Sequence, residues 1–398
     1  MLSKSLVSFR GVLAFGVLCV STAAFGQADN WLNPAGGNFD TDSNWSLGSP
    51  GAGNPTFNLG SAYTVDFTQS DTDEGLNVEN DNVTFDLGGN TFQCTALTTG
   101  VTTSPPSDMT LSGGGTVLLT SSGLGAVPVA INNSGDLTIN ATSVTENATS
   151  ESVTSTGPLT VENGGQLKQT NLQGGSMNLS GNLTVNDGTV HAIGALTLGT
   201  ASITAGSTVS TLGAAGPSPS SIAISASGAI GIDASQLTAQ NESVLFNTGS
   251  ALTLTDNASV GAPDGDITLA GSTDIQSGQI SSGITTTLGG SLLIQLNANM
   301  IGVDGAALTA PNLSLGGTLQ VTLPGNLAPV SGDEYQLYYD SNTITGTFTN
   351  VSLPTLPSGE SWNTSQLYTD GIISVVPEPA SLGLLFAAGG LLLRRRRA

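Results

Sequence analysis

Residues 159–165 read Leu-Thr-Val-Glu-Asn-Gly-Gly, and this unit, apolar-Thr-apolar followed by a turn, decides the fold. Alternation places the two aliphatic side chains on one side of a strand and the threonine on the other. Asn and Gly end the run because turns need residues that tolerate unusual backbone angles. Variants of the unit recur at residues 137–140, 183–188, 196–199, 252–257, 267–271 and 313–317.

The intervals between these units favour a solenoid. Leu137, Leu159 and Leu183 follow one another at intervals of 22 and 24, and Leu292 precedes Leu313 by 21. Other intervals fall out of step, such as the much shorter one from Leu183 to Leu196. A near-repeat of about 20–25 residues with short strands is typical of one coil of a parallel β-helix. We therefore expect an all-β, right-handed parallel β-helix with an aliphatic interior and Thr, Ser and Asn outside.

An array of β-sandwiches is the alternative architecture. It would need more large core aromatics than the 5% of Phe, Trp and Tyr in this chain, and these gather at the two ends of the repetitive region. We expect aromatic β caps there, because an open coil edge would template aggregation. Sugar stacking is the alternative role for the tryptophans. The aromatic residues concerned are Trp31, Phe39, Trp45, Phe57, Tyr63 and Phe67 at the front, and Tyr335, Tyr338, Tyr339, Phe348, Trp362 and Tyr368 at the back.

The flanks also carry a resemblance. Residues 31–40, 44–45 and 51–53 are similar to the opening of exported β-helical proteins with autotransporter-like passenger repeats, and segments within residues 332–367 are similar to their closing segment. The resemblance implies an exported β-helical body. The expected organisation is a signal peptide at 1–26, an N-terminal β cap with the first coils at 27–95, a β-helix body at 96–330, a C-terminal β cap at 331–376 and a sorting and membrane segment at 377–398.

Charge is distributed very unevenly along the chain. Six of the seven Lys and Arg residues lie at the two ends, and only Lys168 lies between residues 27 and 376. Since one of the 29 acids lies in the tail, this body has 28 acids against one base, a net charge of −27. Such a surface repels phosphate backbones, which excludes nucleic acid as a partner. With only 9% charged residues and a mean hydropathy of +0.14, the body is expected to fold.

The segment at residues 1–26 predicts a bacterial signal peptide read by the secretion translocon. Lys4 and Arg10 precede an apolar run at residues 11–20, and small residues follow, with cleavage expected after Gly26 or Ala28. The run is too short to cross about 30 Å of hydrocarbon. Its removal leaves Cys94 as the only cysteine of the mature chain, so no internal disulfide can form.

The tail has three parts in a fixed order. Pro377, Glu378 and Pro379 precede an apolar stretch at residues 380–393, and a basic cluster follows. The cluster consists of Arg394, Arg395, Arg396 and Arg397. The positive-inside tendency is expected to keep it in the cytoplasm.

This order resembles the PEP-CTERM sorting signal. The resemblance implies recognition of the Pro-Glu-Pro motif by exosortase, a membrane cysteine peptidase, while a short hydrophobic helix anchors the chain transiently in the inner membrane. Transfer to the outer cell envelope or to an extracellular exopolysaccharide matrix would follow. An ordinary C-terminal membrane anchor is the alternative.

Residues suited to catalysis are scarce. A polysaccharide lyase needs a strong base, and Lys168 is interpreted as a solvated side chain in a turn. His191, the only histidine, is interpreted as an exposed strand residue. A glycoside hydrolase needs two carboxylates about 5–9.5 Å apart. Asp256, Asp264 and Asp266 could supply them, although no spacing singles them out.

No cofactor is expected apart from a structural calcium ion, which acidic loops at residues 40–42, 71–75 and 79–82 could bind. Asx turns explain the same residues without an ion. The sequence therefore predicts an exported, non-catalytic structural protein of the cell surface or exopolysaccharide matrix. A polysaccharide-degrading β-helix enzyme and a carbohydrate-binding adhesin that uses the end tryptophans are the alternatives.

Overall fold

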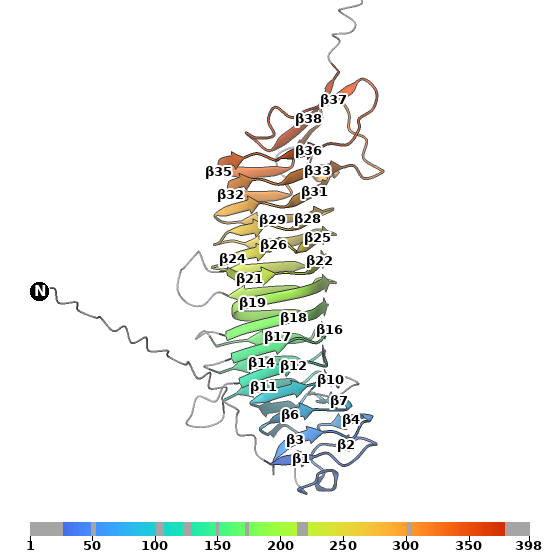
Figure 1. Cartoon of the computed structure of the whole chain (residues 1–398). Coiled ribbons are helices and arrows are strands. Elements are labelled where there is room, and N and C mark those ends of the chain that lie inside the picture. The colour runs from blue at the N-terminus through green and yellow to red at the C-terminus, as the bar shows by residue number, and fades with distance from the viewer. Residues whose placement is uncertain are drawn as a thin grey trace, which may run out of the picture.

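The structure, a computed structural model, describes residues 27–48, 53–100, 107–121, 129–148, 151–171, 175–212, 222–300 and 305–378. These residues form a parallel β-solenoid of about 11 turns, with 61% strand, so the expected all-β parallel β-helix is confirmed. Within the described ranges the only helical elements are two short 3-10 turns, η1 (Asp42–Asn44) and η2 (Ala298–Met300). Figure 1 shows the coils stacked along one axis. The predicted signal peptide and C-terminal hydrophobic helix lie outside the described residues.

A full coil contributes a strand to each of three faces, and every strand pairs in parallel with its counterparts in the neighbouring coils. The first face, here called the threonine face, contains β2 (Gly37–Asn38), β4 (Ala62–Asp66), β7 (Asn82–Asp86), β10 (Asp108–Ser112), β13 (Asp136–Asn140), β16 (Leu159–Glu162), the second part of β18 (Gly175–Asn186), the last part of β19 (Thr189–Thr204), β22 (Ala229–Asp233), β25 (Ala251–Thr255), β28 (Ser272–Ile275), β31 (Ser291–Gln295), β33 (Thr318–Thr322) and β36 (Asn350–Ser352).

The second face contains β5 (Asp71–Thr72), β8 (Thr91–Cys94), β11 (Thr116–Thr120), β14 (Ser143–Asn147), β17 (Gln166–Gln169), the first part of β19, β20 (Thr208–Leu212), β23 (Gln236–Gln240), β26 (Ala258–Ala262), β29 (Gly278–Ser282) and the first parts of β32 (Leu308–Leu315) and β35 (Tyr338–Gly346). The third face contains β1 (Ala28–Asn30), β3 (Asn54–Phe57), β6 (Gly75–Val78), β9 (Ala96–Thr99), β12 (Val129–Asn133), β15 (Glu151–Ser155), the first part of β18, the middle of β19, β21 (Ile222–Ala226), β24 (Ser243–Phe246), β27 (Ile267–Leu269), β30 (Thr285–Leu288) and the second parts of β32 and β35.

The register explains the intervals seen in the sequence. Leu159 pairs with Leu137 in one neighbouring coil and with Leu183 in the other, so the two intervals between these leucines are true coil lengths. Leu196 lies on the third face of the coil that contains Leu183, which explains the short interval. Our use of the interval between Leu292 and Leu313 was wrong, because Leu292 pairs with Leu319. Leu313 belongs to the third face.

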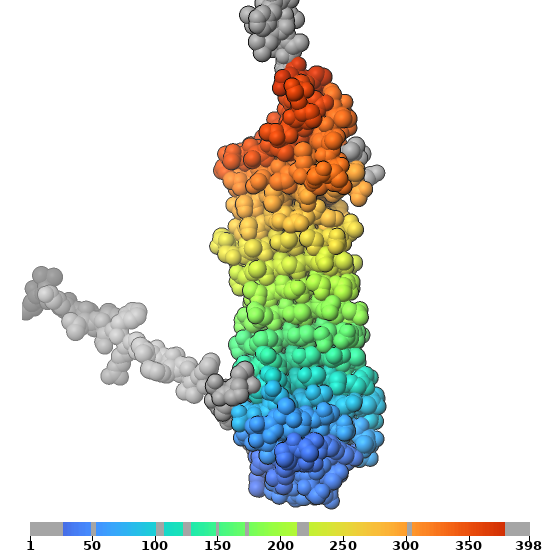
Figure 2. Space-filling view, turned by 90° about the vertical axis from the view of Figure 1, so that its right-hand side faces the viewer, coloured from blue at the N-terminus to red at the C-terminus, as the bar shows by residue number. Residues whose placement is uncertain are grey.

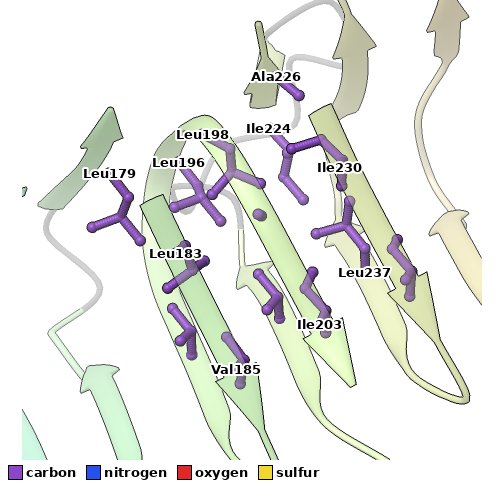
Figure 3. Close-up of a cluster of buried hydrophobic side chains, with 14 of the residues drawn as sticks. Leu179, Leu183, Val185, Leu196, Leu198, Ile203, Ile224, Ala226, Ile230 and Leu237 are labelled. Atoms are coloured by element: carbon purple, nitrogen blue, oxygen red, sulfur yellow. The ribbon is translucent and has the colours of Figure 1, made fainter. Parts of the chain in front are cut away.

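The interior is a continuous aliphatic stack. Alternate residues of each strand point inward, as in Leu159 and Val161, which are at most 1% exposed. Figure 3 shows this packing at the middle of the column, where Val185 lies beside Ile203 of the next coil and Ile230 lies one coil farther on. Burial of each such side chain contributes roughly 1.5–3 kcal/mol. This packing holds the described residues together without the disulfides that small secreted domains use.

The corner after the threonine face repeats one backbone feature. In the quoted stretch, Asn163 and Gly164 have φ of 53° and 79°, as expected for an Asn-Gly turn. The left-handed region is costly for residues with a side chain, since Cβ approaches the next carbonyl. Nevertheless Ala234 occupies it with φ of 49°. Left-handed residues at this corner in eight coils are Gly88, Gly113, Ala141, Asn163, Asp187, Ala205, Ala234 and Asp256.

Aromatic side chains fill the interior at both ends of the column. Trp31 and Trp45 are 0% and 2% exposed, and their rings meet edge to face with centroids 5.1 Å apart. The segment around Trp45 runs along β1, where the Ser46 N–H donates to the carbonyl of Asn30. At the other end an antiparallel sheet of β34 (Glu334–Gln336), β37 (Glu360–Asn363) and β38 (Ile372–Pro377) adjoins buried Tyr338 (Figure 1).

Exchanging Ala234 for Gly should stabilise the column by up to about 1 kcal/mol, because glycine relieves the left-handed strain at this exposed corner. The matched control is Ala229→Gly at the start of β22, the strand that precedes Ala234. There alanine is also exposed, but its φ is not left-handed. That change should destabilise by about 0.5–1 kcal/mol. Chemical unfolding monitored by circular dichroism measures both; shifts of the same sign would contradict the corner geometry.

Candidate functional site

The middle outward position of the threonine face is threonine in six successive coils. Backbone pairing places each one directly beside the next, about 4.8 Å away. A column of hydroxyl and methyl groups therefore runs along the solenoid. Its members, in order, are Thr64, Thr84, Thr110, Thr138, Thr160 and Thr184. The next three coils place Ser202, Gly231 and Thr253 at the same position.

Carboxylates flank this column on both sides. Asp108 and Asp136 are register neighbours two residues before the threonines, and Asp66 and Asp86 are register neighbours two residues after them. Directly adjacent like charges on a sheet are destabilising. Burial raises the pKa of Asp108, and the neighbouring Asp136 carboxylate raises it further.

A shallow groove of about 410 Å³ lies where β4, β7 and β10 meet on this face. Thr64, Thr84 and Thr110 line its floor, and Ala62, Asn82 and Asp108 line one side. The small side chain at Ala62 leaves space beside its larger neighbours. Figure 2 views the column from the side on which these strands lie, with β4 to β10 in the blue part near the lower end. The groove thus offers hydroxyls, an amide and a carboxylate to a ligand.

The second face carries the single base of the described residues. Lys168 lies in β17, so our placement of this residue in a turn was wrong. It is in register with His191, whose Nδ1 lies 2.9 Å from Oγ of Ser210 in the next coil. Burial lowers the pKa of His191, and Lys168 lowers it further. These residues form a row on a sheet surface.

The three acids considered for glycoside hydrolysis do not all lie together. Asp256 follows β25 at the corner between the threonine face and the second face. Asp264 and Asp266 lie between β26 and β27, at the corner between the second and third faces. The structure therefore separates Asp256 from the other two.

Carboxylates of the acidic loops considered for calcium accept hydrogen bonds from the protein itself, although one oxygen of Asp73 is buried without a hydrogen-bond partner. Asp81 accepts hydrogen bonds from the backbone N–H groups of Leu59 and Ser61 at 2.8 and 3.0 Å, and from the hydroxyl of Tyr63. Burial raises the pKa of Asp73 to about 7. In the part of the chain that the structure describes, no group of three or more His, Cys, Asp or Glu residues could hold a metal ion.

The front tryptophans do not form a sugar-stacking platform. Both rings are buried, and the indole N–H of Trp45 donates to the carbonyl of Phe39 at 2.7 Å. The indole N–H of Trp31 donates to the carbonyl of Asn33 at 2.6 Å. Trp362 is half-buried, and its N–H donates to the carbonyl of Pro354 at 2.7 Å. An adhesin that uses Trp31 and Trp45 is therefore excluded.

Two residues of the expected sorting motif lie within the described residues. Pro377 is the last residue of β38 and pairs with Glu360, and the N–H of Glu378 donates to the carbonyl of Gly359 at 2.9 Å. Both motif residues are exposed. Pro379 and the basic cluster lie outside the described residues. Among the described elements, no helix has the length and apolarity to span a membrane.

The sequence analysis missed a buried polar cluster between the second and third faces. Glu146 is 0% exposed, and one of its carboxylate oxygens accepts a hydrogen bond from the amide of Gln169 at 3.0 Å. Its other oxygen has no partner. Burial, with a smaller contribution from the carboxylate of Glu151, raises the pKa of Glu146 to about 8, although the hydrogen bond from Gln169 lowers it. Alternation from Val144 could have identified Glu146 as inward-facing.

Comparisons with known proteins give no relative. No protein family, no curated protein and no solved structure matches the chain.

Replacing Glu146 with Gln should make the column more stable at alkaline pH. The folded state holds the Glu146 proton up to a pKa of about 8, above the ordinary value of 4.5, so stability falls as pH rises through this window. The variant should lose that fall, and its melting temperature should exceed the parent's at pH 8 by more than at pH 5. Thermal scans at both pH values measure this. Glu162→Gln on the threonine face is the control; an equal gain there would contradict the assignment.

Proposed function

We propose that this protein is an exported, non-catalytic structural protein of the cell surface or exopolysaccharide matrix, processed through a PEP-CTERM signal at residues 377–398. The observation that carries the proposal is the unbroken register of the threonine face, which stacks threonine hydroxyls on one another through six successive coils. A polymer that lies along these six coils meets the same group at each of them. Such a repetitive surface suits adhesion to a matrix better than it suits a reaction at one point.

The column has the build of a rigid spacer. The 14 stacked strands that the structure describes on the threonine face, at roughly 4.8 Å per step, give a length of roughly 60 Å. We take its winding to be right-handed, as is usual for crossovers between parallel strands. We interpret the buried aromatics at the two ends as caps that keep the coil edges from pairing with other chains.

The place of the sorting motif supports processing. Pro377 and Glu378 are exposed at the end of the last strand, so a peptidase could reach them beside the folded body. In this proposal the secretion translocon exports the chain, the tail holds it transiently in the inner membrane, and an exosortase-type peptidase releases it. The protein then resides in the outer cell envelope or the extracellular matrix.

A carbohydrate-binding adhesin is the second candidate. The groove over β4, β7 and β10 favours it, because hydroxyl and amide groups line a concavity on an otherwise regular face. A polysaccharide-degrading enzyme has less support, since Asp256 lies at a different corner from its other candidate acids, Asp264 and Asp266.

Processing can be tested on the tail itself. In cells with exosortase, mass spectrometry of the mature protein should show a chain that lacks Arg394–Arg397, and deletion of the peptidase should restore these residues. Glu378→Ala should also retain the arginines, because it removes the motif carboxylate. Glu334→Ala, an exposed acid of the same antiparallel sheet, is the control and should be processed normally. Retention of the arginine cluster in cells with exosortase and without it would refute the sorting proposal.

A further inference from the structure

We infer that the threonine face binds a linear glycan with free amino groups, which lies along the solenoid axis across β4, β7, β10 and β13. The inference depends on the proposed role of this face as a binding surface, and it is independent of the sorting signal. Three features of this face support the inference: the groove, the threonine column and the carboxylates that flank the column.

The negative charge of the threonine face favours a cationic partner. Asp108 stacks on Asp136, and Asp66 stacks on Asp86, so two pairs of like charges flank the column within four coils. No ion pair or hydrogen bond to the side chains of Asp66, Asp108 and Asp136 is found among the described residues. The single base of the body, Lys168, lies on the second face. Because nothing in the described chain offsets this repulsion, amines from outside the protein would.

The geometry selects a linear polymer. The threonines of the floor repeat at about 4.8 Å, so each sugar ring of an extended chain meets a new hydroxyl. A hydroxyl both donates and accepts, as do the hydroxyls of sugars. The groove of about 410 Å³ gives part of the chain a concave seat, and the carboxylates of Asp66 and Asp108 lie on opposite sides of the threonine column.

The binding region ends where the pattern ends. Farther along the same face, Gly231, Asp274 and Leu293 occupy the position of the threonines. Loss of the hydroxyl column there confines the continuous surface to the first half of the solenoid. An acidic glycan would be repelled by the net charge of −27 between residues 27 and 376. A neutral glycan would leave the stacked carboxylates unmatched.

Calorimetric titration of the full-length chain in mild detergent tests the inference. The probes are a glucosamine oligomer, the same oligomer fully N-acetylated, and an alginate oligomer, at a pH where the amines are protonated. The chain should bind the free-amine oligomer at least ten-fold more tightly than the acetylated one and should not bind alginate. Equal affinity for the two related oligomers would overturn the inference, as would absence of binding.

Matched variants locate the site. Asp108→Asn with Asp136→Asn should weaken binding of the free-amine oligomer at least ten-fold, and it should not destabilise the fold, because it removes a repulsion. Thr84→Val with Thr110→Val keeps the side-chain shape and should also weaken binding.

The control, Asp264→Asn with Glu334→Gln, removes two charges from exposed positions elsewhere. Equal loss in the control would show non-specific attraction and overturn the site. Since purified chain is used, failure here would not bear on tail processing.

Discussion

Parallel backbone hydrogen bonding between successive coils is the constraint on which the whole molecule depends. It places each residue directly beside the residue at the same position of the next coil. Where neighbouring coils carry the same residue type at one position, their side chains therefore form a continuous row along the column. Leu137, Leu159 and Leu183 thereby become one apolar stack, and the threonines that follow them become one hydroxyl column. With Cys94 as a free, buried thiol, the described fold depends on these bonds and on the aliphatic interior instead of disulfides.

Because of the same constraint, like charges at one register position destabilise the folded column. An acid that recurs at one register position lies about 4.8 Å from its copy, and the body has almost no cations to separate them. Asp108 and Asp136 show the effect on the surface, and Glu146 shows the related effect of burial inside. Dilute charge and abundant neutral hydroxyls limit this repulsion between coils, and the few stacked acids mark positions where an external partner could change the balance.

The sequence predicted what depends on local pattern. The Leu-Thr-Val unit predicted a strand and which of its side chains point inward, and Asn163 and Gly164 predicted the corner after it. The aromatic residues predicted that bulky rings are buried at the two ends. It could not show which strands share a face, because the register step is short between Thr184 and Ser202 and much longer between Gln320 and Ser352. The difference in coil length comes from corner segments of different lengths. The pairing of Asp108 with Asp136, which are distant in the sequence, was invisible for the same reason.

Distances between spin labels on the threonine face test the stacked register most directly. On a chain without residues 1–26, and so without Cys19, burial raises the pKa of the remaining Cys94 thiol, so cysteines introduced in place of Thr64 and Thr184, or of Thr64 and Thr253, would be labelled selectively. These pairs are five and eight coil steps apart, roughly 24 and 38 Å at about 4.8 Å per step. Pulsed electron resonance should give two narrow distributions whose centres differ by about 14 Å. Broad distributions, or a difference near zero, would contradict a single continuous column.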